Sequence, residues 1–195
     1  MSDETIDLLT KQLTPCRFPK RYLLIREGVY HKYAYFIEKG ITRSYWLVDG
    51  KEVTTSFSCE GDIVFSMDEL YYGKPSEEFV ETLEDVLLYA IPIKTLTELY
   101  ETNIELANWG RVIHQNGYRE LHRKHKERLT LSARERYAKL KERLPDVCSR
   151  VNLGYIAAYL GITLPTLSKI RDSASDIYLR MNGNTSLTNL TVVIY

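Results

Sequence analysis

Two histidines three residues apart have a spacing that could bind a metal ion. His122 and His125 lie in a stretch expected to be helical, where positions three apart share a face. Arg123, Lys124 and Lys126 stand around them, and these cations oppose a further positive charge. We therefore expect both histidines to face solvent or a phosphate, and we predict no metal site.

Nucleophilic and redox chemistry find little support in the sequence. Cys16, Cys59 and Cys148 are odd in number and far apart, without a CxxC pair, so we expect reduced thiols and no disulfide framework. There is no glycine-rich phosphate loop and no GxSxG motif. An enzyme is therefore not predicted, and no cofactor is expected.

Charge is distributed unevenly along the 195 residues, although the formal net charge is zero. Residues 1–118 hold 12 Lys and Arg against 19 Asp and Glu, a balance of −7, whereas residues 119–171 hold 13 against 5, a balance of +8. This asymmetry suggests that only the second half meets a polyanion. Solvated helix faces would give the same charges, so a more specific motif must decide.

Composition limits the remaining classes of protein. A hydrophobic content of 44% allows one large domain or two small ones with their own cores. The longest apolar run, residues 86–93, is far shorter than the ~20 residues of a membrane-spanning helix. The acidic start Met1-Ser2-Asp3-Glu4 is unlike a secretory signal. We therefore expect a cytoplasmic protein without a membrane partner.

The first half is expected to be an all-β barrel behind a short amphipathic helix that stops before Pro15. Segments rich in Tyr, Ile, Val, Phe and Thr alternate with turn residues, which is typical of a sandwich or barrel. Asp49-Gly50 is the clearest hairpin signal, because a tight two-residue turn needs positive φ. The predicted strands are residues 22–26, 33–38, 41–48, 53–59, 63–66, 79–83 and 86–91.

A long helix is predicted from Ile93 to about residue 128. Leu99, Leu106 and Ile113 recur every seven residues and could form the seam of a dimer. The alternative is a helix packed along its own barrel. Dimerisation is favoured, because a long helix exposes more apolar surface than a small barrel can cover.

Residues 153–171, LGYIAAYLGITLPTLSKIR, predict two crossed helices. Ala157 is small enough for a close crossing, and Gly161 can take the left-handed conformation of the turn. Thr163 is a suitable N-cap for the second helix, and Pro165 fits its first turn. The outward face suits the major groove of DNA, although an ordinary αα-hairpin would have the same length. The predicted DNA-contacting residues are Asn152, Thr163, Thr166, Ser168, Lys169 and Arg171.

With both halves considered, the chain resembles the Crp/Fnr superfamily of transcription regulators, the relatives of the cyclic-AMP receptor protein. The similarity spans residues 15–171: LLIREGVYHKYAYFIEKGITRSYWLVDGKEVTTSFSCEGDIV is similar to the family's barrel, and VNLGYIAAYLGITLPTLSKIR to its DNA-binding motif. The resemblance implies an α+β fold with a cyclic-nucleotide-binding-like barrel of the jelly-roll (double-stranded β-helix) type, a long dimer helix and a C-terminal helix-turn-helix. It also implies a homodimer on two-fold symmetric double-stranded DNA. The expected divisions are residues 1–92, 93–128 and 129–171, with residues 172–195 as a tail.

The resemblance fails at the ligand site. Cyclic-nucleotide binders of this family place a Gly-Glu pair at the ribose and an Arg-Ser pair at the phosphate, whereas Phe65-Ser66 and Ser76-Glu77 stand here. A cyclic phosphate needs cations or N–H donors, and Glu77-Glu78 would repel it, so no cyclic-nucleotide binding is predicted. The barrel aromatics either fill the core or line a cavity for an unknown effector. The candidate pocket residues are Tyr35, Trp46, Phe65, Ser66, Ser76 and Glu77.

The second helix of the motif also departs from the family pattern. Leu164 and Pro165 replace the base-contacting side chains of the best-known member, which leaves Thr166, Ser168 and Lys169 to contact bases. Residues 188–195 could form one strand. The main alternative function is a sensor or scaffold whose helix-turn-helix contacts protein instead of DNA.

Overall fold

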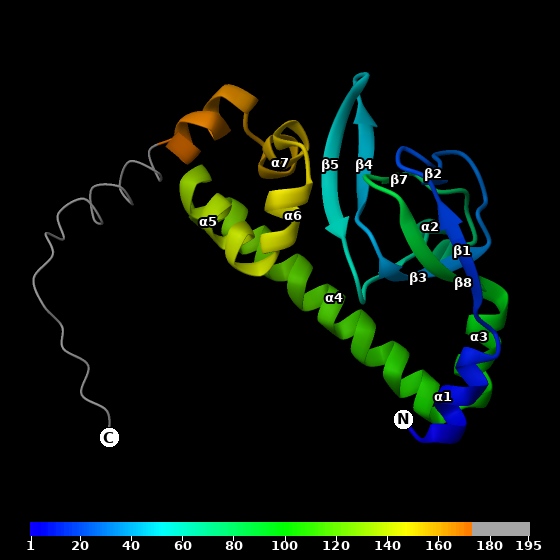
Figure 1. The fold of residues 1–195 in the computed structure, drawn as a ribbon. Coiled ribbons are helices and arrows are strands. Elements are labelled where there is room, and N and C mark those ends of the chain that lie inside the picture. The colour runs from blue at the N-terminus through cyan, green and yellow to red at the C-terminus, as the bar shows by residue number, and fades with distance from the viewer. Residues whose placement is uncertain (173–195) are drawn as a thin grey trace, which may run out of the picture.

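The computed structural model describes residues 1–172, in which a β-barrel is followed by a set of helices (Figure 1). The strands are β1 (Thr14–Phe18), β2 (Leu23–Ile25), β3 (Tyr33–Lys39), β4 (Thr42–Val48), β5 (Lys51–Ser58), β6 (Ile63–Val64), β7 (Phe79–Thr82) and β8 (Val86–Pro92). They form two antiparallel four-stranded sheets, in the orders β1-β8-β3-β6 and β2-β7-β4-β5. The predicted antiparallel barrel and the α+β class are confirmed. The tail and the strand expected at residues 188–195 lie outside the described residues.

The hairpin predicted at Asp49-Gly50 joins β4 to β5. Both residues have positive φ, 50° and 72°, and Val48 pairs directly with Lys51, so the loop contains two residues. Consecutive positive φ angles match the right-handed twist of the two strands. The β4–β5 hairpin consequently stands out from the barrel as an arm beside the later helices (Figure 1).

Two elements of the barrel region were not predicted. β1 contains Pro15, and it lies at the edge of its sheet, where a proline costs no ladder hydrogen bond on the open side. The first helix, α1 (Asp3–Thr10), ends well before that proline. Helix α2 (Met67–Tyr72) begins at the N-cap Ser66, which shortens the strand expected over residues 63–66. Gly73 ends α2 in the left-handed conformation.

The prediction of one unbroken helix from Ile93 to about residue 128 is wrong. The helices that follow are α3 (Ile93–Thr102), α4 (Ile104–Thr130), α5 (Ala133–Arg143), α6 (Pro145–Arg150) and α7 (Leu153–Leu160), and residues 164–172 are also helical. Asn103 separates α3 from α4 with extended angles, φ −130° and ψ 111°. Its side-chain oxygen accepts hydrogen bonds from the backbone N–H groups of Glu105 and Leu106, each at 3.0 Å, so it caps α4 instead of continuing α3.

This break divides the predicted dimer seam. Leu99 lies on α3, whereas Leu106 and Ile113 lie on α4. Leu106 is fully buried in a cluster with Leu9 of α1 and with residues of the barrel, and Leu99 packs against the same cluster. Leu99 and Leu106 therefore hold α3 and α4 to their own barrel.

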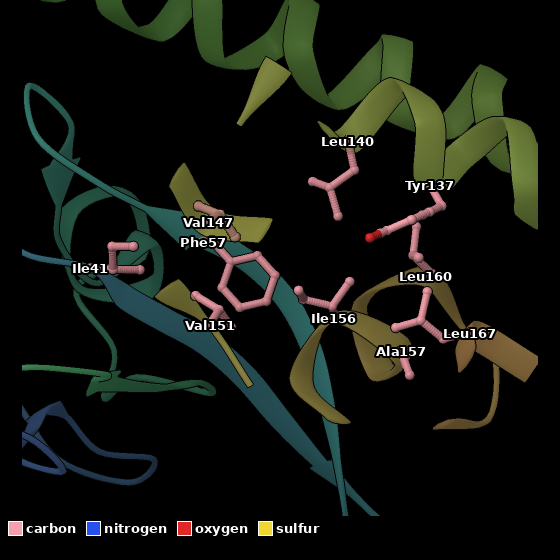
Figure 2. Packing of buried hydrophobic residues seen from close by; sticks show 10 residues of the cluster. All are labelled: Ile41, Phe57, Tyr137, Leu140, Val147, Val151, Ile156, Ala157, Leu160 and Leu167. Carbon is pink, nitrogen blue, oxygen red and sulfur yellow. The ribbon is translucent and has the colours of Figure 1, made fainter. Parts of the chain in front are cut away.

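The helices after α4 pack on the barrel through a shared core (Figure 2). Phe57 of β5 and Ile41, which precedes β4, belong to the same buried cluster as residues of α5, α6, α7 and the 164–172 helix. Leu140, Ile156 and Leu167 are all 0% exposed within it. Helix α5 is fixed at its start by a capping box in which Ser132 and Glu135 bond reciprocally. Among residues 1–172, no helix is both long and apolar enough to span a membrane.

Candidate nucleic-acid interface

A pair of helices lies at the position that the sequence motif predicts. Helix α7 ends at Gly161, which has the left-handed angles φ 66° and ψ 34°, and the 164–172 helix follows. The N–H of Ile162 donates to the carbonyl of Ala157 at 3.0 Å, closing the turn. Ala157 is 2% exposed and Leu167 is 0% exposed, so both helices bury their apolar sides.

The opposite side of the 164–172 helix faces solvent. Thr163, Thr166, Lys169 and Arg171 are exposed, and Ser168 is half-buried. Thr163 acts as the N-cap, with its hydroxyl accepting from the N–H of Thr166 at 3.3 Å. The exposed surface therefore presents hydroxyl groups and two cations, which suit phosphate and base contacts in a major groove.

Asn152, the remaining predicted contact residue, begins α7. Its side-chain oxygen accepts from the N–H of Gly154 at 2.7 Å, and the residue is exposed. A helix N-terminus with free N–H groups favours anions. Asn152 therefore positions the start of α7 and lies where a DNA phosphate could approach.

Arg43 of β4 connects the barrel to α7, and the sequence analysis missed it. This arginine is 1% exposed, and its Nη2 donates to Glu52 at 2.7 Å and to Glu81 at 2.9 Å. Its guanidinium carbon lies 4.2 Å from the ring centroid of Tyr45 and 3.8 Å from that of Tyr155 on α7. Burial makes this stacking stronger than an exposed cation–π contact. The arginine therefore joins the β2-β7-β4-β5 sheet to the first helix of the pair.

A second ionic connection links α6 to the barrel. Arg150 donates to Glu60, at 2.9 Å from Nη2 to Oε1, and to Glu84. The guanidinium group of Arg150 lowers the pKa of Glu60 to about 2. All three side chains are partly exposed, so their free-energy contribution is modest and sensitive to salt.

The six residues predicted to line a ligand pocket do not surround one cavity. Tyr35 is 9% exposed in a cluster that fills the barrel, and Trp46 is 49% exposed on the hairpin outside it. Phe65 packs edge-on against His114 of α4, with ring centroids 6.1 Å apart. Side chains along a strand alternate between the two faces of a sheet, and Trp46 lies on the face that points away from the barrel interior. It therefore cannot line a cavity inside the barrel with the other five residues.

Ser66, Ser76 and Glu77 lie together around α2, and their polar groups are engaged within the chain. The hydroxyl of Ser66 caps α2, and that of Ser76 bonds to the backbone of Glu78. The N–H of Glu77 donates to Asp68 at 2.8 Å. Burial, with a smaller contribution from Asp68, raises the pKa of Glu78 to about 7. This corner is therefore rich in carboxyl groups.

The two histidines do not converge on a common ligand. The ring of His122 stacks on that of Tyr118, with centroids 6.4 Å apart, and His125 lines a separate pocket beside α5. Within residues 1–172, no three His, Cys, Asp or Glu side chains are grouped so that they could hold a metal ion.

Comparison with known proteins identifies the barrel. Residues 15–103 match the family described as the cyclic nucleotide-binding domain. No curated protein sequence matches the chain significantly.

Several solved structures share the fold of the whole chain. FixK2 from Bradyrhizobium japonicum is 21% identical, with a TM-score of 0.69, and the match covers 91% of this chain and 89% of FixK2. The c-di-GMP-responsive global regulator CLP from Xanthomonas campestris is 19% identical, with a TM-score of 0.67 and coverage of 100% and 99%. A structure described as a transcriptional regulator of the Crp/Fnr family from Eubacterium rectale is 15% identical, with a TM-score of 0.69 and coverage of 96% and 88%.

These findings agree with the resemblance stated from the sequence. The chain shares the fold of these solved structures, and residues 15–103 match the cyclic nucleotide-binding domain.

Proposed function

We propose that this protein is a homodimeric transcription regulator that binds double-stranded DNA through the helix pair of α7 and residues 164–172. The observation that supports this most directly is the two-sided character of the second helix. Leu167 is fully buried while Lys169 and Arg171 are exposed, so the helix keeps its core contacts and still offers cations to a polyanion. The balance of +8 over residues 119–171 provides an attractive field around it.

Exposed apolar side chains on α4 support the homodimer. Ile104, Tyr118 and Leu129 are 76%, 70% and 73% exposed. Their spacings of 14 and 11 residues are close to whole numbers of helical turns, so they share one face. Leu106 and Gly110, both buried, lie on the opposite side of the same helix. Association of two copies through this face would align two helix pairs on a two-fold symmetric site.

Regulation by cyclic nucleotides is not part of this proposal. The corner around α2 holds Asp68, Glu77 and the half-buried Glu78, and the hydroxyls of Ser66 and Ser76 are already bonded. A cyclic phosphate would meet the negative charge of these carboxylates there. Calorimetric titration with cyclic AMP and cyclic GMP should give no heat of binding in the barrel.

The experiment that tests DNA binding begins with selection of bound sequences from genomic DNA by the full-length protein. Affinity for a selected fragment is then measured by fluorescence anisotropy at several salt concentrations. Lys169→Ala with Arg171→Ala removes four cations from each dimer, so it should weaken binding roughly 10- to 100-fold and reduce the steepness of log K against log salt by about 4. The matched control, Lys11→Ala with Lys94→Ala, removes two exposed lysines far from the helix pair and should change neither quantity.

Equal binding by both double variants would contradict the assignment of the binding surface. Absence of any salt-dependent DNA binding would favour a sensor or scaffold whose helix pair contacts protein.

A further inference from the structure

A pocket of about 230 Å³ opens between the barrel arm and the helices. Its walls come from the β4–β5 hairpin, from the second half of α4, and from α5 and α7. It is separate from the corner around α2, where this fold class would be expected to hold a cyclic nucleotide. We propose that this pocket binds a small organic anion that carries an aromatic or aliphatic body.

The charge of the pocket favours an anion. Its lining includes the cations Lys124, Arg128, Arg136 and Arg143, against a single carboxylate, Glu127. Glu127 is already paired with Arg143 at 3.1 Å. The remaining three cations have no carboxylate within 4.0 Å among residues 1–172. The pocket therefore holds uncompensated positive charge.

Unused hydrogen-bonding groups line the same space. Arg136 donates its two Nη groups to the carbonyls of Leu131 and Leu160, each at 3.0 Å, and its buried Nε has no hydrogen-bond partner within residues 1–172. The buried hydroxyls of Thr54 and Thr55 also lack a partner in this described part of the chain. Buried polar groups without partners are costly, so a ligand that accepts from them would recover that free energy.

The surroundings of Lys124 oppose its positive charge. Its Nζ lies 5.4 Å from the ring centroid of Tyr159. Burial, followed by the neighbouring guanidinium groups of Arg143 and Arg123, lowers the pKa of Lys124. An anion bound among these groups would attract Lys124 and offset its repulsion by the guanidinium groups.

The other lining residues indicate what the uncharged part of the ligand should be. Trp46, Val53, Leu121 and Tyr159 add apolar and aromatic surface beside the cations. The volume is below the ~300 Å³ at which pockets for drug-sized ligands begin. It suits a carboxylate or sulfonate with one or two rings, whose body packs against Trp46 and Tyr159 while the charged group meets the arginines and Lys124.

An NMR titration of the full-length protein with 2-naphthoate tests the proposal. The probe should shift the indole N–H of Trp46 and backbone signals of the hairpin, α4 and α7. 2-Naphthamide, with the same shape but no charge, should bind at least roughly tenfold more weakly, because a charged hydrogen bond is lost. Bound 2-naphthoate should also raise the Tm, since it touches both the barrel and the helices.

Matched double variants locate the site. Lys124→Gln with Arg128→Gln should weaken 2-naphthoate binding roughly tenfold. Arg111→Gln with Arg119→Gln removes the same charge from exposed positions on α4 outside the pocket and should leave binding unchanged.

Four results would overturn the proposal: no shifts up to about 10 mM probe, equal affinity for the charged and neutral probes, equal affinity in the two double variants, or a dimer structure in which the partner subunit fills the pocket. None of these measurements involves DNA, so the pocket can fail while the proposed DNA binding stands.

Discussion

Arg43 of β4 and Tyr155 of α7 lie in direct contact, with the guanidinium carbon 3.8 Å from the tyrosine ring centroid. The arginine belongs to the barrel and the tyrosine to the helix pair, so this stacking crosses the junction between the two. Phe57 of β5 extends the same junction into the core of the helices, because its ring lies 5.4 Å from that of Tyr159.

Removing the ring of Tyr155 should loosen the helix pair from the barrel. Tyr155→Leu abolishes the cation–π contact with the buried Arg43 while the carboxylates of Glu52 and Glu81 continue to bind that arginine. We expect the free energy of unfolding to fall by about 2 kcal/mol and hydrogen exchange in α7 to become faster, with exchange in β3 and β8 unchanged. Tyr155→Phe keeps the ring and should behave as the wild type. Equal exchange rates in α7 of the Leu and Phe variants would show that the stacking does not hold the junction.

Glu78 should make the protein less stable as the pH rises from about 4.5 to about 7. The pKa of about 7 in the folded protein lies above the ordinary glutamate value of 4.5, so folding takes up a proton in this interval. The contribution of Glu78 to the free energy of unfolding is therefore most favourable below pH 4.5. It declines as the pH rises to about 7 and is constant above that pH.

The variant Glu78→Gln tests this pH dependence. It removes the ionisation and should be more stable than the wild type by about 1 to 3 kcal/mol at pH 8, with a much smaller difference at pH 4.5. Urea unfolding of both proteins at the two pH values measures the effect. Glu77→Gln, at an exposed neighbour, is the control. A difference between Glu78→Gln and wild type that does not vary with pH would contradict the raised pKa.

Two glycines of α4 should respond oppositely to alanine. At Gly117 a Cβ would meet no atom of residues 1–172 within 4 Å, so Gly117→Ala should stabilise the helix by about 0.5 to 1 kcal/mol. At Gly110 the Cβ would stand 2.8 Å from the Tyr100 ring of α3. Gly110→Ala should therefore destabilise the protein by about 1 kcal/mol or more, because α3 and α4 must separate. Thermal unfolding measures both. If Gly110→Ala stabilised the protein as much as Gly117→Ala, the close packing of α3 on α4 would be wrong.

The proposed dimer should dissociate when charge is introduced on the outer face of α4. Tyr118→Glu with Leu129→Glu should shift the mass in light scattering from two chains to one, because two buried carboxylates would have no partners. Val48→Glu with Tyr72→Glu alters exposed apolar residues that do not belong to α4 and should leave a dimer. A dimer that survives the first pair of substitutions would place the interface elsewhere.

Local chemistry made much of the barrel predictable. Asp49-Gly50 could be assigned to a hairpin because positive φ at two successive positions is a property of the residues themselves. The turn at Gly161 and the cap at Thr163 followed from the same kind of argument. The prediction of one helix failed at Asn103. The heptad spacing of Leu99, Leu106 and Ile113 suggested a single helix, but Asn103 caps α4 and separates it from α3.

The sequence by itself determined the barrel class, the Asp49-Gly50 hairpin and the cationic, hydroxyl-bearing side of the second helix, because each depends on periodicity, turn residues or charge within a short segment. Only the tertiary structure decided that Arg43 meets Tyr155, that Arg150 meets Glu60, and that Lys124 and Arg136 share a pocket with Trp46. These partners are far apart in sequence, and no short-range pattern specifies which surface of a barrel a later helix will cover.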